Sequence, residues 1–313
     1  MIRNGSQRHW SVPLLAMVLA LSLVTGFAVT AGLRVRRKEQ DGMNDWRVEP
    51  LSIAHRGDDS APENSLHAIA NAGAAGADFA EIDVRLASDG TPVVFHDRKT
   101  GRLAADGRNV PVNALPAHEL MHMTMRQYDE NFHVPTLAEA ILTAQRASDH
   151  MGLLIDLKTG SRHALQLTRA VAKQISRYRF TDRVMFMSTN DDAIRAIQRH
   201  HPYWTVGKCI SPAGRPAIEW PRGVSFVVMR GNRVDRSVIR HAKRDDVPVY
   251  AGVDGDYIRA KECLKLGADG ILGASARRVR KLAERFAVNV PADSNGNFDE
   301  MPAWKEQPFW HMW

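Results

Sequence analysis

The chain has 313 residues, of which 44% are hydrophobic and 25% are charged, and its formal net charge is +7. These proportions are ordinary for a globular protein and exclude a disordered chain or a collagen-like repeat. Two cysteines, Cys209 and Cys263, are too few for a disulfide framework and lack metal-binding spacing, so we expect both to be small buried residues. The positive charge favours an anionic small molecule or a membrane surface as partner. Nucleic acid is not expected, because the basic residues are scattered without an aromatic stacking pattern.

The first feature along the chain is an uncharged run over residues 10–33, which follows a short basic segment over residues 1–9. About 20 apolar residues span a bilayer as a helix, and this run exceeds the usual core of a signal peptide. We therefore predict a transmembrane anchor in a single-pass membrane protein, with a cleaved signal as the alternative. The flanking basic residues favour a cytoplasmic catalytic domain without deciding the membrane face. Residues 34–49 are polar and are expected to form a linker.

From residue 50 to residue 290, short apolar strands alternate with helical segments. This α/β alternation predicts a parallel sheet, and its length predicts closure into an irregular (β/α)8 TIM barrel, because nine strands are expected where a regular barrel has eight. Residues 101–125 show no clear core pattern and are expected to pass over the barrel mouth. Residues 291–313 are an aromatic-rich tail. No feature of the sequence predicts an oligomeric state.

Three polar clusters follow apolar runs, namely His55-Arg56-Gly57, Glu81-Ile82-Asp83 and His96-Asp97. Barrel enzymes carry their chemistry at such strand ends. Side chains alternate along a strand, so Glu81 and Asp83 share a face, where two carboxylates repel each other unless a cation lies between them. Oxygen ligands favour a hard cation, Mg²⁺ or Ca²⁺.

A hairpin signal, Asp89-Gly90, lies between the second and third clusters. If these two residues are the turn, Asp83 faces His96 across the hairpin, which places an imidazole beside the carboxylates. A slip of one residue would undo this pairing.

A fourth cluster, Asp156-Leu157-Lys158, follows the apolar residues 152–155. Asp156 and Lys158 share a face because they are two residues apart. Alone, the pair is best explained as a surface ion pair at a strand end. Beside the other three clusters, it is better explained as a metal ligand and a phosphate-binding cation.

The ordered set of motifs resembles the glycerophosphodiester phosphodiesterase family, within the phospholipase-C-like phosphodiesterases. The family pattern of His-Arg, Glu-x-Asp and His-Asp is present in the first three clusters. Four further matches are Pro62-Glu63-Asn64, Gly76-Ala77-Asp78, Val134-Pro135-Thr136-Leu137 and Gly267-Ala268-Asp269-Gly270-Ile271. The resemblance runs from about residue 53 to about residue 272 and implies a TIM barrel that cleaves phosphodiesters.

Three positions depart from the family pattern. Asp156 stands where glutamate is usual, and its side chain is one methylene shorter, so the cation or the strand must shift. Sphingomyelinase-D-like relatives use aspartate there. Tyr250-Ala251-Gly252 replaces a Trp-Thr-Val strand, which removes an aromatic wall and widens the expected site. Leu272-Gly273-Ala274 replaces the usual Thr-Asp and is expected to affect packing more than chemistry.

The resemblance implies metal-dependent hydrolysis of glycerophosphodiesters to sn-glycerol 3-phosphate and an alcohol. One divalent cation, Mg²⁺ or Ca²⁺, would be held by Glu81, Asp83 and Asp156. His55 would be the general base and His96 the general acid, since imidazole titrates near neutral pH.

Four further residues have expected supporting roles. Arg56 and Lys158 would hold the substrate phosphate, the arginine as a bidentate fork and the lysine as a point charge. Glu63 would orient Arg56 or its loop, and Asp97 would hold His96 by a hydrogen bond.

Two other functions fit the same residues. A phospholipase-D-type enzyme acting on lysophospholipids or sphingolipids would use the same metal site, and a widened pocket near a membrane suits a lipid. A membrane-tethered protein that binds phosphodiesters without turnover would result if Asp156 disables catalysis.

Overall fold

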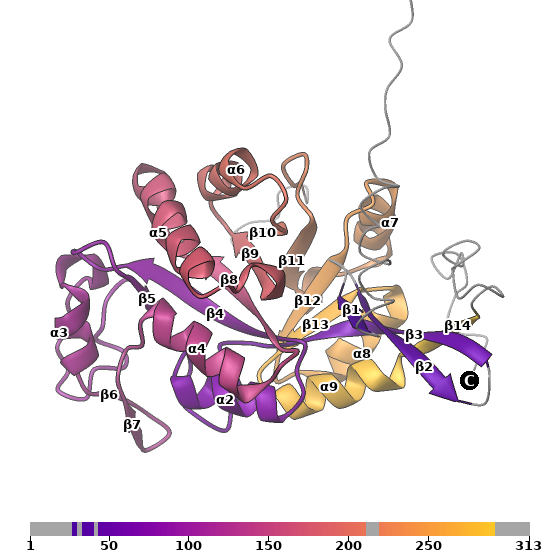
Figure 1. The fold of residues 1–313 in the computed structure, drawn as a ribbon, viewed down its shortest axis with the longest axis horizontal. Helices are drawn as coiled ribbons and strands as arrows, with labels where there is room; N and C mark the ends of the chain where they lie inside the picture. Colours follow the sequence, from indigo (N-terminus) through magenta and orange to yellow (C-terminus); the bar gives the residue numbers. More distant parts are fainter. Residues whose placement is uncertain (1–26, 30–32, 41–42, 211–218, 292–313) are drawn as a thin grey trace, which may run out of the picture.

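The computed structural model describes residues 27–29, 33–40, 43–210 and 219–291. Eight parallel strands form a barrel in the order β3-β4-β8-β9-β10-β11-β12-β13, and β13 pairs with β3 to close it (Figure 1). The predicted TIM barrel is therefore confirmed. Its strands are β3 (Met43–Ala54), β4 (Phe79–Leu86), β8 (Gly152–Leu157), β9 (Val184–Ser188), β10 (Val206–Cys209), β11 (Phe226–Arg230), β12 (Val249–Asp254) and β13 (Gly270–Gly273).

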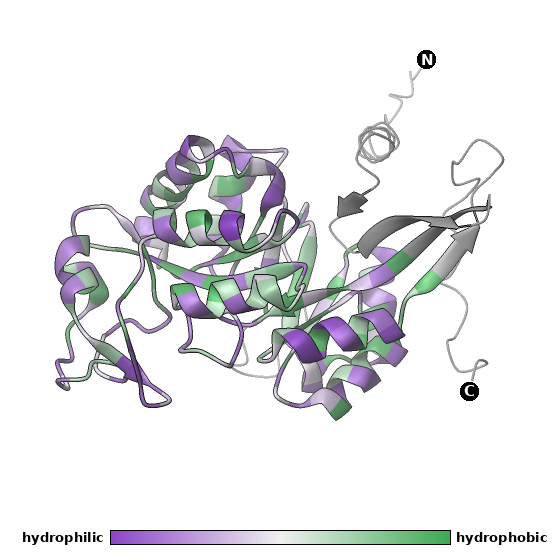
Figure 2. Cartoon of the chain, turned by 60° about the horizontal axis from the view of Figure 1, so that its bottom comes forward, coloured by the Kyte–Doolittle hydropathy of each residue, from purple (hydrophilic) through white to green (hydrophobic). Residues whose placement is uncertain are grey.

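Helices cover the outside of the barrel and bury their apolar faces against the strands (Figures 1 and 2). Side-chain caps start several of them: the Ser65 hydroxyl accepts from the Ala68 amide, and Thr136 forms a capping box with Glu139. The described barrel helices are α2 (Leu66–Ala74), α4 (Leu137–Ala147), α5 (Ala164–Arg177), α6 (Asp191–His200), α7 (Arg236–Arg244), α8 (Tyr257–Leu266) and α9 (Ala276–Arg285).

The barrel interior changes from apolar to polar along the strands. At the floor, the end where the strands begin, the interior is filled by Leu51, Phe79, Leu154 and Tyr250. Because inward positions recur every second residue, the next inward residues lie towards the C-terminal ends. These ends form the mouth, and there the chain places acids, histidines and basic side chains.

The ninth expected strand is β5 (Pro92–Val94), which pairs antiparallel with β4 outside the closed barrel. The predicted register was wrong by one residue. Thr91 pairs with Ala87, so the turn holds the three residues Ser88 to Gly90, and the Phe95 amide donates to the Asp83 carbonyl. Gly90 has φ +82°, the left-handed conformation that ends a three-residue hairpin loop. His96 therefore does not face Asp83 in the ladder.

Residues 95–134 form an insertion at the mouth with a small core of its own. It contains the 3₁₀ turn η1 (Val112–Ala114), helix α3 (Ala117–His122) and the hairpin β6 (Met125–Gln127) and β7 (Glu130–Phe132). Its buried residues include Leu103, Val112, Leu115, Leu120 and Met125. Residues 101–125, which show no clear core pattern in the sequence, thus supply most of this small core.

A second sheet extends from the floor. The outer part of β3 pairs antiparallel with β2 (Leu33–Gln40) and β14 (Val288–Pro291), and β1 (Phe27–Val29) pairs with β2. Residues 34–40 and 43–49 thus form strands where a linker was expected. The anchor predicted over residues 10–33 lies mostly outside the described residues. None of the described helices is long and apolar enough to cross a bilayer. The aromatic tail also lies outside the described residues, apart from Pro291 at the end of β14.

A buried ion cluster links the last helix to the first strands. Arg280 on α9 is 6% exposed and contacts the carboxylate of Glu49 on β3. Its guanidinium also lies 3.3 Å from Asp78, whose carboxylate accepts from the Ser52 amide and hydroxyl. The cluster lies where β13 closes onto β3.

Candidate active site

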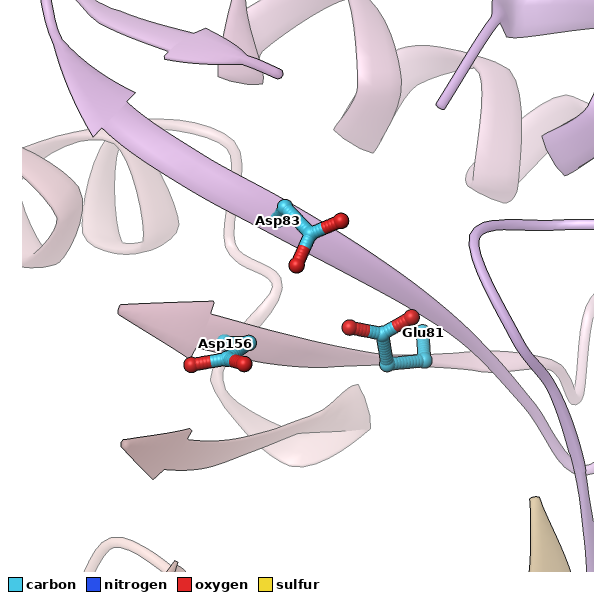
Figure 3. A group of neighbouring side chains, drawn as sticks. All are labelled: Glu81, Asp83 and Asp156. Carbon is cyan, nitrogen blue, oxygen red and sulfur yellow. The ribbon is translucent and has the colours of Figure 1, made fainter. Parts of the chain in front are cut away.

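Three buried carboxylates form the centre of the mouth. Glu81 and Asp83 project from β4, and Asp156 projects from the neighbouring β8, towards one another (Figure 3). One oxygen of each lies within 4.8 Å of the others, and the residues are 1%, 1% and 2% exposed. Asp156 Oδ1 is buried and has no hydrogen-bond partner among the described residues. Because a buried, unpaired carboxylate oxygen is costly, the group fits a divalent cation held by oxygen ligands.

Without a cation, the three carboxyl groups differ in pKa and so in how readily they ionise. Burial, reinforced by the charge of Asp83, raises the pKa of Glu81 to about 8, and burial also raises the pKa of Asp156. Burial alone would raise the pKa of Asp83, but the charges of Lys158, His96 and Arg56 lower it to about 2. The site therefore holds fewer than three full negative charges when no cation is bound.

Two basic side chains border the carboxylates on the side of β8. Lys158 Nζ lies 2.5 Å from Asp156 and 3.1 Å from Asp83, and these charges raise the pKa of its ammonium group. The Arg85 guanidinium donates to the backbone carbonyls of His96 and Lys158 at 2.9 and 3.3 Å. Arg85 thereby holds the loop that carries His96 against the end of β8.

His55 follows β3 and is positioned by Asp254 at the end of β12. His55 Nδ1 lies 2.9 Å from Asp254 Oδ1, while Nε2 lies 3.9 Å from Glu81 Oε2. Burial lowers the pKa of His55, but the hydrogen bond to Asp254 and the charge of Glu81 outweigh burial and raise it. Asp254 has φ +45° and follows a register shift between Gly252 and Asp254, which turns its side chain towards His55.

The loop after His55 is wound tightly around the carboxylates. Arg56 and Gly57 have φ values of +57° and +84°, and a side chain at Gly57 would collide with Ala68. The Arg56 amide donates to Glu81 at 2.8 Å, and its guanidinium lies 3.0 Å from Glu63. Asn64 donates to the Asp83 carboxylate at 2.8 Å and accepts from the Asp83 amide.

His96 belongs to a chain of ion pairs that crosses the mouth. Its Nδ1 lies 2.6 Å from Asp97, and Asp97 lies 2.6 Å from Arg102 Nε. Arg102 in turn donates two hydrogen bonds to Glu63, the residue that contacts Arg56. Although the register of β5 differs from the prediction, the charge of His96 still acts on Asp83 and Asp156.

A cavity of about 470 Å³, here called cavity 1, opens beside His55 and Arg56. Its apolar wall comes from the ends of β10, β11 and β13 and includes Cys209, Val228 and Leu272. The substituted strand contributes Gly252 to this wall, whereas Tyr250 lies below it, stacked on Phe226 with ring centroids 4.8 Å apart. Burial raises the pKa of the Cys209 thiol to about 12, so this cysteine behaves as an apolar wall residue.

Sequence reasoning found nine residues that the structure brings to the mouth and missed four others. The missed residues are Asn64, Arg85, Arg102 and Asp254. Two of these had a usable signal, because Arg85 continues the inward series of Glu81 and Asp83, and Asp254 continues that of Tyr250 and Gly252.

Comparison with known proteins agrees with this site. Residues 55–274 match the model of the glycerophosphoryl diester phosphodiesterase family. A glycerophosphodiester phosphodiesterase of Caldanaerobacter subterraneus is 31% identical over 166 residues, which are 51% of this chain and 66% of that enzyme. One from Arabidopsis thaliana is 25% identical over 251 residues, covering 77% of this chain and 75% of the plant protein.

Solved structures agree as well. A phosphodiesterase of Oleispira antarctica, determined in complex with its product sn-glycerol-3-phosphate, superposes with a TM-score of 0.67 at 26% identity, covering 75% of this chain and 97% of that one. The family match includes both histidines, the three carboxylates and the loops that hold them. The chain therefore belongs to the glycerophosphoryl diester phosphodiesterase family, a family of phosphoric diester hydrolases.

Proposed function

We propose that the chain hydrolyses glycerophosphodiesters to sn-glycerol 3-phosphate and an alcohol, using one divalent cation and two histidines. The observation that carries this proposal is the convergence of three buried carboxylates within 4.8 Å, with His55 3.9 Å from Glu81 and with His96 near enough for its charge to act on Asp83 and Asp156. The Oleispira enzyme, whose product is sn-glycerol-3-phosphate, supports the choice of substrate.

The carboxylates would hold Mg²⁺ or Ca²⁺, both of which take oxygen ligands. When bound, the cation polarises a phosphoryl oxygen and neutralises charge in the transition state. Arg56 and Lys158 lie beside the carboxylates and present cationic donors to the remaining phosphate oxygens. Since Lys158 contacts Asp83 and Asp156, it also limits the repulsion between them.

The two histidines divide the proton transfers. Asp254 accepts a hydrogen bond from His55 Nδ1. The other ring nitrogen, Nε2, is then available to take a proton from the attacking hydroxyl. That hydroxyl belongs to water or to the glycerol of the substrate. Asp97 accepts from His96 Nδ1 in the same way, which leaves Nε2 of His96 to protonate the departing alkoxide.

A second candidate, a phospholipase-D-type reaction on lysophospholipids, is favoured by the apolar wall of cavity 1. The same carboxylates and histidines would serve it. Comparing glycerophosphocholine with lysophosphatidylcholine as substrates separates the two functions, and binding of both without hydrolysis of either would indicate a protein that lacks turnover.

The test is hydrolysis of glycerophosphocholine, with release of sn-glycerol 3-phosphate as the readout. Chelation by EDTA should abolish release, and Mg²⁺ or Ca²⁺ should restore it. His55→Ala and His96→Ala should each lower kcat by roughly 10²–10⁴-fold, as loss of a general acid or base does. His67→Ala is the matched control, because His67 is exposed on α2 and pairs with Glu130. Full activity in EDTA, or in either active-site variant, would contradict the proposal.

A further inference from the structure

A second cavity of about 470 Å³, here called cavity 2, lies between the β4–β5 hairpin, η1 and the start of α5, where β4 contacts η1 and β5 contacts α5. Five of its lining residues are basic or can become so, and within the part of the chain that the structure describes none of its lining residues carries a carboxylate. The five are Arg85, Arg98, Lys99, Lys158 and His163. Cavity 1, by contrast, is lined by four acidic residues. The two cavities therefore differ in charge.

The cations of cavity 2 are of two kinds. Arg85 and Lys158 are fixed, since Arg85 donates to two backbone carbonyls and Lys158 is paired with the metal-site carboxylates. Arg98 and Lys99 are exposed, and no ion pair joins either to a carboxylate among the described residues. A concave wall with fixed and unpaired cations attracts anions, and arginine and lysine are the side chains that bind phosphate.

The uncharged polar residues that line cavity 2 suit the part of a ligand that surrounds a phosphate group. Ser88, Asn113, Thr159 and Gln166 offer hydroxyl and amide groups, which match the hydroxyls of a polyol. The first turn of α5 contains no acidic residue that would repel an anion from this wall. Cavity 2 is also larger than one phosphate needs, so it has room for a phosphate together with part of a polyol.

Two residues connect cavity 2 to the side on which the alcohol is proposed to leave. Arg85 lines it and holds the backbone carbonyl of His96, the residue proposed to protonate the departing alkoxide. Lys158 lines it and also contacts Asp83 and Asp156. An alcohol that leaves towards His96 therefore leaves towards Arg85 and Lys158, which line cavity 2, whereas His55 and Arg56 line cavity 1.

We propose that cavity 2 binds a phosphate group carried by the alcohol of the substrate, so that the enzyme prefers phosphodiesters whose alcohol is itself a polyol phosphate. This inference rests on the proposed function, because it assumes that the scissile phosphate lies at the three carboxylates and that the alcohol leaves towards His96. The sequence motifs do not identify this alcohol.

The test uses two substrates that differ by one phosphate, glycerophosphoglycerol and glycerophosphoglycerol phosphate. Wild-type enzyme should have a kcat/KM for the phosphorylated substrate roughly tenfold higher, and the ratio should fall as salt is added. The double variant Arg98→Ala/Lys99→Ala should bring the ratio close to one, mainly through KM, while kcat/KM for glycerophosphoglycerol stays the same. Arg169→Ala/Lys173→Ala is the matched control, because it removes the same charge from exposed positions of α5 outside cavity 2.

The outcomes separate the two proposals. If wild-type enzyme hydrolyses neither substrate, the proposed function fails, and this inference fails with it. If both are hydrolysed with equal efficiency, or if the Arg98/Lys99 variant keeps the wild-type ratio, the function stands and the role of cavity 2 is wrong. Calorimetry with inorganic phosphate tests the alternative that cavity 2 binds free phosphate and not a phosphate group of the substrate. If the variant loses phosphate binding but keeps the wild-type substrate ratio, cavity 2 binds a free anion, which overturns the proposal.

Discussion

His55 has one ring nitrogen available for proton transfer, because Asp254 occupies the other at 2.9 Å. The pairing sets the tautomer as well as the ring orientation, since the proton on Nδ1 is held by the carboxylate. Asp254 is 75% exposed, so solvent screens much of its charge. Its effect should therefore be smaller than that of a buried acid in the same role.

We expect Asp254→Asn to lower kcat by about ten- to a hundredfold while KM changes little. Loss of the negative charge should also lower the pKa of His55, which shifts the acidic limb of the kcat/KM profile to lower pH. A profile from pH 5 to pH 9 measures both effects. Asp182→Asn is the control, because Asp182 is exposed in the 3₁₀ turn η3 (Thr181–Arg183), before β9. An unchanged pH profile would show that Asp254 does not act on His55.

We expect cation binding to compete with protonation of the Glu81 carboxylate. Burial beside Asp83 raises the pKa of Glu81 to about 8 in the absence of a cation, and a cation needs the ionised carboxylate. Below pH 8 binding should release a proton, so affinity should weaken as pH falls, by up to about tenfold per pH unit. Calorimetry with Mg²⁺ or Ca²⁺ at pH 6.5 and pH 9, in buffers with different ionisation enthalpies, measures affinity and proton release. Equal affinity at both pH values would contradict this expectation.

The central carboxylates were predictable from sequence because two simple rules determine their position. Alternation along a strand puts Glu81 and Asp83 on one face, and parallel strands bring their C-terminal ends together, which adds Asp156. Arg102 and Asn64 were not predictable in this way. They come from loops whose paths depend on left-handed residues and on the packing of the insertion, and no periodicity describes such paths.

At the level of elements, the insertion is coupled to the mouth through Arg102. This residue joins Asp97, beside His96, to Glu63, beside Arg56, and so connects the loops after β5 and β3. Gln127 in the β6–β7 hairpin strengthens the link, since its side chain accepts from the Glu63 amide at 2.7 Å. The insertion therefore helps to fix the spacing between the two halves of the site.

We expect Arg102→Ala to lower kcat/KM by roughly tenfold while the free energy of unfolding changes by less than about 1 kcal/mol, since Arg102 is partly exposed. Kinetics and urea denaturation of the same preparation measure the two quantities. Arg126→Ala serves as the reference, because Arg126 pairs only with Asp129 at the tip of the hairpin among the described residues. Equal activity of the two variants would show that Arg102 does not position the loops that carry His96 and Arg56.

Two errors in the predicted elements have a common physical origin. The hairpin register failed because Ser88 joins Asp89 and Gly90 in the turn, and a turn of three residues shifts every later pairing by one. The linker expected over residues 34–49 was wrong because antiparallel backbone pairing joins β2 to β3, and such pairing does not need the continuous apolar run of a barrel strand. Both features are set by backbone hydrogen bonds, which the pattern of apolar residues does not report directly.

At the level of the whole molecule, a buried ion cluster joins the helix after the last barrel strand to the first two strands. Arg280 follows the last barrel strand and contacts Glu49 in the first one, as well as Asp78 before the second. Replacing the arginine removes a buried positive charge from beside two buried carboxylates, which is costly in the low dielectric of the interior. The cost should be much larger than that of losing a surface charge on the same helix.

We expect Arg280→Met to lower the free energy of unfolding by about 3–5 kcal/mol, measured by urea denaturation. Arg277→Met is matched to it, because Arg277 is exposed on α9, and it should change stability by less than about 0.5 kcal/mol. Similar midpoints for both variants would show that the cluster does not stabilise the closure.

The outer sheet has a practical consequence for handling the enzyme. Phe27 pairs with Arg36, which pairs with Arg47, and Pro291 pairs with Asp45, so both limits of the described chain lie in the sheet built on the outer half of β3. That half extends from the floor, whereas substrates enter at the opposite end of the same strand, next to His55. A support, tag or fusion partner joined directly at either position would sit behind the catalyst and leave the substrate's route unobstructed.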